Sequence, residues 1–223
     1  MEYWEKLKQP KIYTTYSAEN FYKLILEKGQ KYLEDSGNTN AKFELNVDEQ
    51  RIYKLLSLYF TDDKAFEKNG LSLQKGIMLI GKIGCGKTTC MKLFAQNQKQ
   101  SFAVIPCRTV EREHTKEGYK AIEKYFHLLR SNPDVTFGQP EIGICFDDLG
   151  TEEMSKNYGN VRNVMSEIIL SRYENEVRAG FKTHTTTNLN EKEMEDNYGS
   201  REFSRIRGMF NFIKFPEVAD KRK

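Results

Sequence analysis

The sequence predicts an α/β fold in which a mostly parallel sheet is flanked by helices. Five short apolar or β-branched runs alternate with longer amphipathic segments, an order typical of a parallel sheet with helical crossovers. A glycine-rich turn follows the first run, and two aspartates end the third. The runs are residues 76–80, 102–105, 142–146, 181–187 and 210–213.

The chain of 223 residues is long enough for one α/β domain and a small appendage. The appendage is predicted at residues 1–45, as a helical arm in which Ser17 caps a helix that runs to about Glu34. A polar loop follows this helix. Residues 46–223 are predicted to form the main domain, whose first helix begins near Asp48 and carries an apolar stripe.

The remaining helices are predicted from apolar spacing and capping signals. A helix over about residues 87–97 follows the glycine-rich turn, and apolar residues three and four apart predict helices over 110–129 and 161–176. Asn190 begins an Asn-x-x-Glu cap for a short helix, and residues 200–209 form another. Strands and helices therefore alternate along the main domain.

Composition indicates a cytoplasmic protein with a charged surface. No apolar run approaches the roughly 20 residues that span a bilayer, so we expect no membrane segment. The first residues also lack the basic and then apolar layout of a signal peptide. Four cysteines without a C-x-x-C pair suggest free thiols in a reducing compartment. A net charge of +3 is too small to argue by itself for nucleic-acid binding.

Residues 81–89 read as a complete phosphate-binding loop between the first strand and a helix. Its glycines let backbone N–H groups point inward, and the positive end of the following helix points at the same place. Lys87 is expected to reach the β- and γ-phosphates, and the Thr88 hydroxyl to ligate Mg²⁺. The pattern therefore predicts a nucleoside triphosphate site. The residues assigned to it are Gly81, Gly84, Cys85, Gly86, Lys87, Thr88 and Thr89.

Two acids stand at the end of the third run, where a parallel strand faces the phosphates. Asp147 is the candidate to hold Mg²⁺ together with Thr88, through the water shell of the ion. Asp148 is the candidate to orient or polarise the attacking water. The alternative is an acidic turn at a strand end without a catalytic role.

Asn188 and a group of three arginines each allow a functional and an ordinary structural interpretation. Asn188 ends the β-branched run and is placed to hydrogen-bond the same water or the γ-phosphate, although Asn at a strand end is also ordinary turn chemistry. Arg201, Arg205 and Arg207 lie on one predicted helix. They are either solvated surface residues or a source of an arginine that completes a γ-phosphate site on a neighbouring subunit.

Together these segments resemble the AAA+ ATPases of the DnaC/IstB type, the bacterial and phage replicative helicase loaders and transposition helper ATPases. The match runs from about residue 46 to the end. Residues 75–88 are similar to the Walker A region of that family, and Phe146-Asp-Asp-Leu-Gly150 to its Walker B motif. Residues 171–173 and 186–190 resemble the helix and sensor 1 segment, and residues 198–207 resemble the segment with the arginine finger.

The resemblance implies an AAA+ core that binds ATP and Mg²⁺ and hydrolyses ATP. It implies catalytic roles for Lys87, Asp147, Asp148 and Asn188. Arg205 is the first choice and Arg201 the second for an arginine finger that acts in the site of the next protomer. The implied assembly is a homo-oligomer with shared ATP sites.

The implied partners are single-stranded DNA and a replicative helicase or transposase, with the arm at residues 1–45 either binding that partner or bracing the core. Two departures from the family pattern matter. Asp148 stands where many AAA+ proteins have Glu, which predicts slow intrinsic hydrolysis. Only sixteen residues follow Arg207, too few for the helical lid of larger AAA+ proteins.

Two other functions stay open from the residues alone. One is a nucleotide-gated adaptor, or an IstB-like transposition helper, that hydrolyses little ATP; the short Asp148 side chain keeps it open. The other is a P-loop kinase that phosphorylates a small molecule. A kinase predicts that the arginines act in their own chain and that the turnover rate does not depend on protein concentration. The short carboxyl terminus and the context of Asn188 argue against a kinase.

Overall fold

The computed structural model describes residues 15–38, 40–151, 155–157, 160–162, 164–179 and 181–217. A six-stranded, mostly parallel sheet forms its centre, with the strand order β2-β4-β7-β1-β8, and β3 pairs antiparallel to the start of β4. This confirms the predicted fold class. The strands are β1 (Gly76–Ile80), β2 (Phe102–Pro106), β3 (Leu129–Arg130), β4 (Glu141–Leu149), β7 (Thr183–Thr187) and β8 (Phe210–Lys214).

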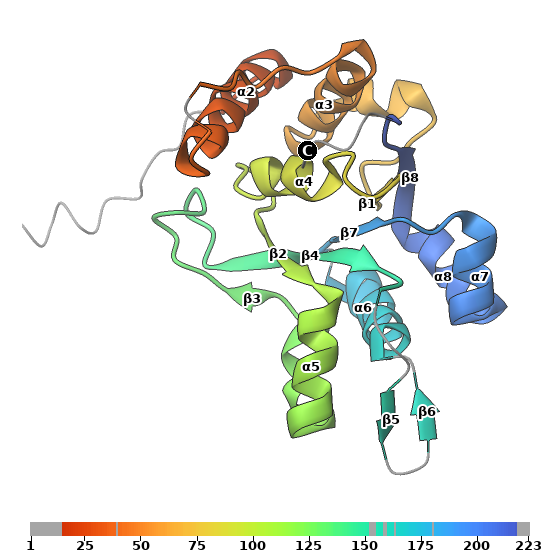
Figure 1. Cartoon of the computed structure of the whole chain (residues 1–223). Helices are drawn as coiled ribbons and strands as arrows, with labels where there is room; N and C mark the ends of the chain where they lie inside the picture. Colours follow the sequence, from red (N-terminus) through yellow and green to blue (C-terminus); the bar gives the residue numbers. More distant parts are fainter. Residues whose placement is uncertain are drawn as a thin grey trace, which may run out of the picture.

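Helices cover both faces of the sheet (Figure 1). One face carries α2 (Ala18–Asp35), α3 (Val47–Phe60), the 3-10 helix η1 (Lys64–Asn69) and α4 (Lys87–Phe94). The other carries α5 (Cys107–Glu117), η2 (Tyr119–Ala121), η3 (Glu123–Phe126), α6 (Val164–Ala179), α7 (Glu191–Tyr198) and α8 (Ser200–Met209). A small hairpin, β5 (Ser155–Asn157) and β6 (Asn160–Arg162), precedes α6.

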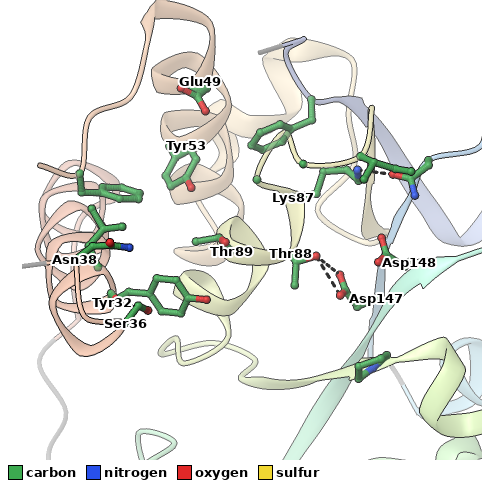
Figure 2. Close-up of a pocket in the computed structure, with 18 of the residues that line it drawn as sticks. Tyr32, Ser36, Asn38, Glu49, Tyr53, Lys87, Thr88, Thr89, Asp147 and Asp148 are labelled. Atoms are coloured by element: carbon green, nitrogen blue, oxygen red, sulfur yellow. Dashed lines mark hydrogen bonds between the residues drawn. The ribbon is translucent and has the colours of Figure 1, made fainter. Parts of the chain in front are cut away.

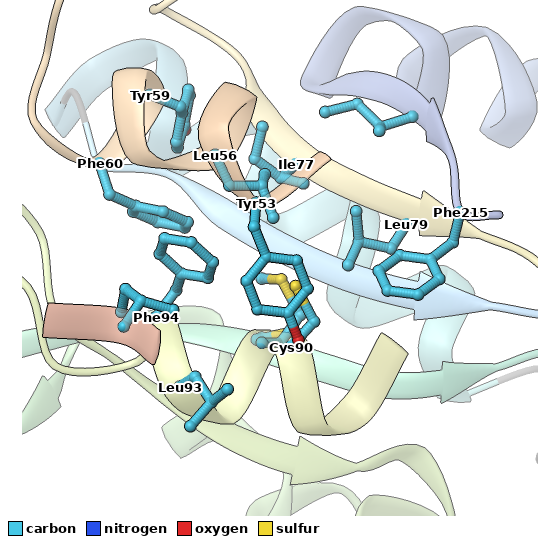
Figure 3. Packing of buried hydrophobic residues seen from close by; sticks show 14 of the residues in the cluster. Tyr53, Leu56, Tyr59, Phe60, Ile77, Leu79, Cys90, Leu93, Phe94 and Phe215 are labelled. Carbon is cyan, nitrogen blue, oxygen red and sulfur yellow. The ribbon is translucent and has the colours of Figure 1, made fainter. Parts of the chain in front are cut away.

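Strand alternation divides the core into two clusters. In β1, Ile77 and Leu79 enter the cluster under α2, α3 and α4, whereas Met78 enters the cluster under α5, α6 and α8. The first cluster is rich in aromatic rings (Figure 3). Phe60 stacks against Phe94, with ring centroids 5.2 Å apart, and joins α3 to the back of α4. The helix that follows the phosphate loop is therefore fixed on its buried side.

Helix α2 packs on this first cluster. Ser17 caps it, as predicted, by accepting a hydrogen bond from the N–H of Asn20. Phe21 is buried and meets Phe94 edge to face at 5.8 Å. Lys28 donates to the carbonyl of Gln96 at 3.2 Å. These contacts favour the bracing interpretation for residues 18–35, while the division of the chain at residue 45 stays a prediction.

Three helix predictions differ from the structure at their ends. The helix predicted over 110–129 stops at Glu117, because Gly118 has a φ of +76° and turns the chain into η2, η3 and β3. Helix α4 ends at Phe94 and not at Asn97, whose side chain accepts hydrogen bonds from Lys99 and Gln100 and forms a turn. The helix predicted from residue 161 begins at Val164.

Two helices near the carboxyl end match the prediction closely. Asn190 caps α7 in a capping box with Glu193, and α8 spans residues 200–209 as expected. No helix follows β8 in the described chain, which reaches Glu217. Among the described residues, no helix has both the length and the apolar character that crossing a membrane requires.

His184 on β7 is a buried polar residue within the aromatic cluster. Its Nδ1 accepts a hydrogen bond from the N–H of Ile77 at 3.0 Å, and the rings of Tyr59, Phe60 and Phe102 surround it. Burial, with a smaller contribution from the charges of Lys182 and Arg172, lowers the pKa of His184 from 6.5 to about 3. The imidazole is therefore neutral in the folded protein.

This lowered pKa predicts acid sensitivity of the fold. Because the unfolded chain binds a proton on His184 near pH 6.5 and the folded chain only near pH 3, its contribution to stability is complete above pH 6.5 and falls as the pH drops toward 3. The slope approaches about 1.4 kcal/mol per pH unit. We expect His184→Asn, which keeps an acceptor but does not titrate, to flatten the free energy of unfolding measured by urea between pH 6.5 and 4. Equal slopes for both proteins would contradict this assignment.

Candidate functional site

A cavity of about 760 Å³ lies at the carboxyl ends of the parallel strands. Its volume is within the range of small-molecule sites in proteins. One wall is the phosphate loop and the end of β4, and the opposite wall is formed by the end of α2, the following segment and α3 (Figure 2). The cavity is thus built from parts of the chain that are far apart in sequence.

The phosphate loop connects β1 to α4 in the form that the motif predicts. Gly84 and Gly86 both line the cavity and have φ values of +79° and +101°, which glycine adopts without strain. Gly86 is the N-cap residue of α4, and no side chain caps this helix end. Its first N–H groups and its positive dipole end therefore face the cavity, an arrangement suited to an anion.

Lys87 is buried, with 4% of its surface exposed. Its Nζ donates to the carbonyls of Gly81 and Lys82 at 2.7 and 2.8 Å and to Oδ1 of Asn188 at 2.7 Å. An ammonium group has three donors, and these oxygens occupy all of them. A phosphate oxygen that reaches Nζ must therefore replace or share one of these acceptors.

Thr88 and Asp147 form the second contact between the loop and the acids. The Thr88 hydroxyl lies 2.8 and 3.0 Å from the two carboxylate oxygens of Asp147, which is 6% exposed. Hard oxygen donors at this spacing suit Mg²⁺, which also keeps several water ligands. No group of three His, Cys, Asp or Glu side chains that could hold a metal occurs in the part of the chain that the structure describes. The Thr88–Asp147 pair therefore fits a magnesium ion that a triphosphate helps to bind.

Asp148 also lines the cavity, and its backbone is unusual. Its φ is +57°, in the left-handed region, and the pairing of β4 with β7 shifts register between Phe146 and Leu149. Asp and Asn enter this region more readily than other residues with side chains. The irregular pairing brings both consecutive acids to the cavity, although neighbouring residues of a regular strand point to opposite faces.

The order of the strands explains where Asn188 lies. β7 is inserted between β1, which leads into the phosphate loop, and β4, which ends in the acids. Asn188 directly follows β7, so it falls between the two and reaches Lys87. The structure thus brings together five residues selected from the sequence, whose catalytic and binding roles stay predictions. They are Lys87, Thr88, Asp147, Asp148 and Asn188.

Two loop residues selected from the sequence do not line the cavity. Gly81 contributes its carbonyl to Lys87, and its position allows close packing, since a Cβ there would lie 3.2 Å from the Cys85 sulfur. Cys85 is fully buried in the core cluster with Phe215. Its side chain therefore packs the loop against the core, whereas Thr89 lines the cavity. The nucleotide-binding roles of both residues stay predictions.

The arginines selected from the sequence lie outside the cavity, on α8. The Arg205 guanidinium lies 5.7 Å from the Tyr173 ring and donates to the carbonyl of Arg201 at 3.4 Å. Arg207 pairs with Glu191 at 3.6 Å on the surface. Helix α8 packs on the sheet face opposite α4, so this placement does not bring these arginines to the site of their own chain.

Sequence reasoning missed the far wall of the cavity. Tyr32, Phe43, Glu49 and Tyr53 line it, and burial raises the pKa of the Tyr53 hydroxyl. No motif marks these residues, because Tyr32, Glu49 and Tyr53 belong to ordinary helices and Phe43 to the segment between them. Arg108, at the start of α5, is a further lining residue that the motifs did not select.

A glycine allows the aromatic wall to form. A Cβ at Gly29 of α2 would overlap the ring of Phe43, so only glycine admits this ring against the helix. Gln30 ties the same segment down: its Oε1 accepts from the N–H of Phe43 at 2.9 Å, and its Nε2 donates to the carbonyl of Ala41 at 3.2 Å. An aromatic ring is thereby held beside a cavity whose other end suits phosphates, an arrangement that fits a nucleobase.

Parallel strands that deliver a glycine-rich loop and an acid pair to one cavity are typical of P-loop nucleoside triphosphatases. The sequence matches the model of the ATPase family associated with various cellular activities (AAA) over residues 77–210, more than half of the chain. The chain belongs to this family.

The curated relatives that match include proteins of proteasome systems. The chain is 27% identical to the proteasome-activating nucleotidase of Thermococcus onnurineus (strain NA1) over 115 residues, 52% of this chain and 28% of that protein. It is 26% identical to the probable 26S proteasome regulatory subunit 6B of Caenorhabditis elegans over 94 residues, 42% of this chain and 23% of that protein. The chain therefore spans less than a third of the length of these relatives.

Solved structures with a similar fold include a helicase loader and DnaA. The crystal structure of the DnaC helicase loader matches with a TM-score of 0.53 at 15% identity, over 88% of this chain and 99% of that one. DnaA from Aquifex aeolicus bound to AMPPCP matches with a TM-score of 0.51 at 13% identity, over 81% of this chain and 50% of that one. At these identities the likeness concerns the fold.

The aromatic wall generates a prediction about nucleotide affinity. We expect Phe43→Ala to weaken ATP binding by about tenfold, since a lost stacking contact costs about 0.5–1.5 kcal/mol beyond the buried area. Affinity for inorganic tripolyphosphate should stay unchanged, because it has no base. Isothermal titration calorimetry with both ligands measures the difference. Val47→Ala, at an exposed apolar residue outside the cavity lining, is the control. Equal losses for both ligands would contradict a base-binding role.

Proposed function

We propose that this protein is an ATP-hydrolysing AAA+ protein of the DnaC/IstB type, a helicase-loader-like factor that acts in DNA replication. The observation that carries the proposal is the division of the site. Loop, acids and Asn188 meet in one cavity, whereas the α8 arginines lie on the other side of the sheet. The fold similarity to the DnaC helicase loader supports the loader role.

The residues in the cavity suit the hydrolysis of ATP by water. The loop N–H groups and Lys87 hold the β- and γ-phosphates, and Thr88 and Asp147 hold Mg²⁺, which supplies charge neutralisation to the phosphates when bound. Asp148 orients the water that attacks the γ-phosphorus, with Asn188 close to the same position. The bond from the γ-phosphorus to the β–γ bridging oxygen breaks, giving ADP and phosphate, and the proton of the water passes to Asp148 or to solvent.

The arginine that stabilises the developing charge comes from a second protomer in this proposal. Arg205 is the first choice, and Arg201 is the second. An arginine finger is worth about 10³–10⁵ in rate, so an isolated protomer hydrolyses ATP slowly. A contact between unlike surfaces repeats in one direction and generates a ring or an open spiral. Single-stranded DNA and a replicative helicase are the partners proposed for such an assembly.

The concentration dependence of ATP turnover tests this function. We expect the rate per protomer to rise with protein concentration and to rise further with single-stranded DNA, because both promote assembly of shared sites. Phosphate release measured over a hundredfold range of protein, with a duplex of equal length as the control, gives the result. A flat rate that single-stranded DNA leaves unchanged would overturn the proposal.

One observation favours a second candidate, a P-loop kinase for a small molecule. Arg108 lines the cavity of its own chain, and the kinase alternative predicts arginines in cis. In a kinase, turnover requires an acceptor other than water and does not depend on protein concentration. The nucleotide-gated adaptor differs from both, because Asp148→Ala would leave its cellular activity intact.

Mixing two inactive variants tests whether the site is shared. We expect Arg205→Ala and Asp148→Ala each to lower turnover by about 10³-fold. An equal mixture should regain about a quarter of the parent rate, since one in four neighbouring pairs then joins an intact cavity to an intact arginine. Arg207→Ala, on the same helix, is the matched control. A mixture as inactive as its components would place the arginine in cis.

A further inference from the structure

Three consecutive threonines join β7 to the irregular end of β4. The Thr185 hydroxyl donates to the carbonyl of Phe146 at 2.8 Å, and the Thr187 hydroxyl donates to the carbonyl of Leu149 at 2.7 Å. Both threonines are buried. These side-chain bonds span the place where the register of the two strands shifts. They hold the strands together across the irregularity.

The middle threonine, Thr186, contacts the acids themselves. It is fully buried, and its hydroxyl lies 2.7 Å from Oδ1 of Asp147 and 2.9 Å from the backbone nitrogen of Asp148. An ionised carboxylate only accepts hydrogen bonds, so the Thr186 proton goes to Asp147. The lone pairs of the same oxygen then accept the N–H of Asp148. One hydroxyl therefore serves both acids.

The contact with Thr186 restrains the side chain of Asp147 and the backbone of Asp148. Asp147 is held from two sides, by Thr88 of α4 and by Thr186 of β7. The left-handed conformation of Asp148 is strained for a residue with a side chain and persists only where surrounding contacts determine it. The hydrogen bond to Thr186 is such a contact. One side chain thus contacts both acids and contributes to their relative placement.

We propose that Thr186 is a positioning residue that sets the geometry of Asp147 and Asp148 relative to each other. The inference rests on the proposed function, in which Asp147 holds Mg²⁺ and Asp148 orients water. Thr186 lies in β7, and Asn188 directly follows the strand. β7 therefore connects to the acids through one residue and to Lys87 through the other.

The test compares Thr186→Val, Thr186→Ser and Thr185→Val. Val has the shape of Thr without its hydroxyl, and Ser restores the hydroxyl. Thr186→Val is expected to lower kcat and to raise the Mg²⁺ concentration for half-maximal turnover, each by about 10- to 100-fold, as is typical when a partner of a metal ligand is removed. Thr186→Ser should recover both. Thr185→Val removes a buried hydroxyl bond to β4 without touching either acid, so its Mg²⁺ dependence should match the parent.

A merely structural role predicts another pattern. Thr186→Val and Thr185→Val would then lower the thermal midpoint alike and leave the Mg²⁺ dependence unchanged, which would overturn the inference. ATP affinity with Mg²⁺ and with EDTA, measured by calorimetry, gives a second readout that needs no turnover. Thr186→Val should lose only the part of the affinity that Mg²⁺ adds.

If the parent protein itself neither binds nor hydrolyses ATP, the proposed function fails and this inference fails with it. Parent activity together with a normal Thr186→Val variant rejects the inference alone.

Discussion

The position of β7 between the strand of the phosphate loop and the strand of the acids is the constraint on which the site depends. Because β7 separates β1 from β4, no residue of the loop strand pairs directly with the acid strand. Polar contacts between the two halves of the site therefore involve β7 or the Thr88 hydroxyl at the start of α4. A polar end on β7 is needed to bridge this gap, and Thr186 and Asn188 supply it.

The burial of Lys87 requires hydrogen-bond acceptors for its ammonium group within the site. A buried ammonium group without partners is unfavourable by several kcal/mol, so its three oxygen acceptors are a condition for folding the loop in this form. Two of those acceptors are backbone carbonyls of the loop itself, and the third is the side chain of Asn188. The site is thus organised around a cation whose position these three oxygens fix.

The local parts of the site were predictable from sequence, whereas the parts that depend on tertiary packing were not. The loop and the acids are marked by glycine spacing and by their place at strand ends. Asn188 was selected from its strand-end position together with the resemblance of residues 186–190 to a sensor 1 segment. The left-handed conformation of Asp148 has no sequence signal of its own, because it arises from the irregular pairing with β7. Phe43 reaches the cavity only because α2 and α3 pack together and Gly29 leaves room for its ring. The helix ends set by Gly118 and Asn97 were missed for a related reason, since their turn chemistry competes with helical periodicity.

A ligand bound in the cavity affects the stability of the packing between its two walls. Residues of α2 and its following segment face residues of the phosphate loop across the same space, so a ligand in it contacts both. A ligand that needs both walls stabilises the folded arrangement by RT ln(1 + [L]/Kd), about 2.7 kcal/mol at a hundredfold excess over Kd. Ligand binding is therefore thermodynamically linked to the packing of α2 beside the phosphate loop.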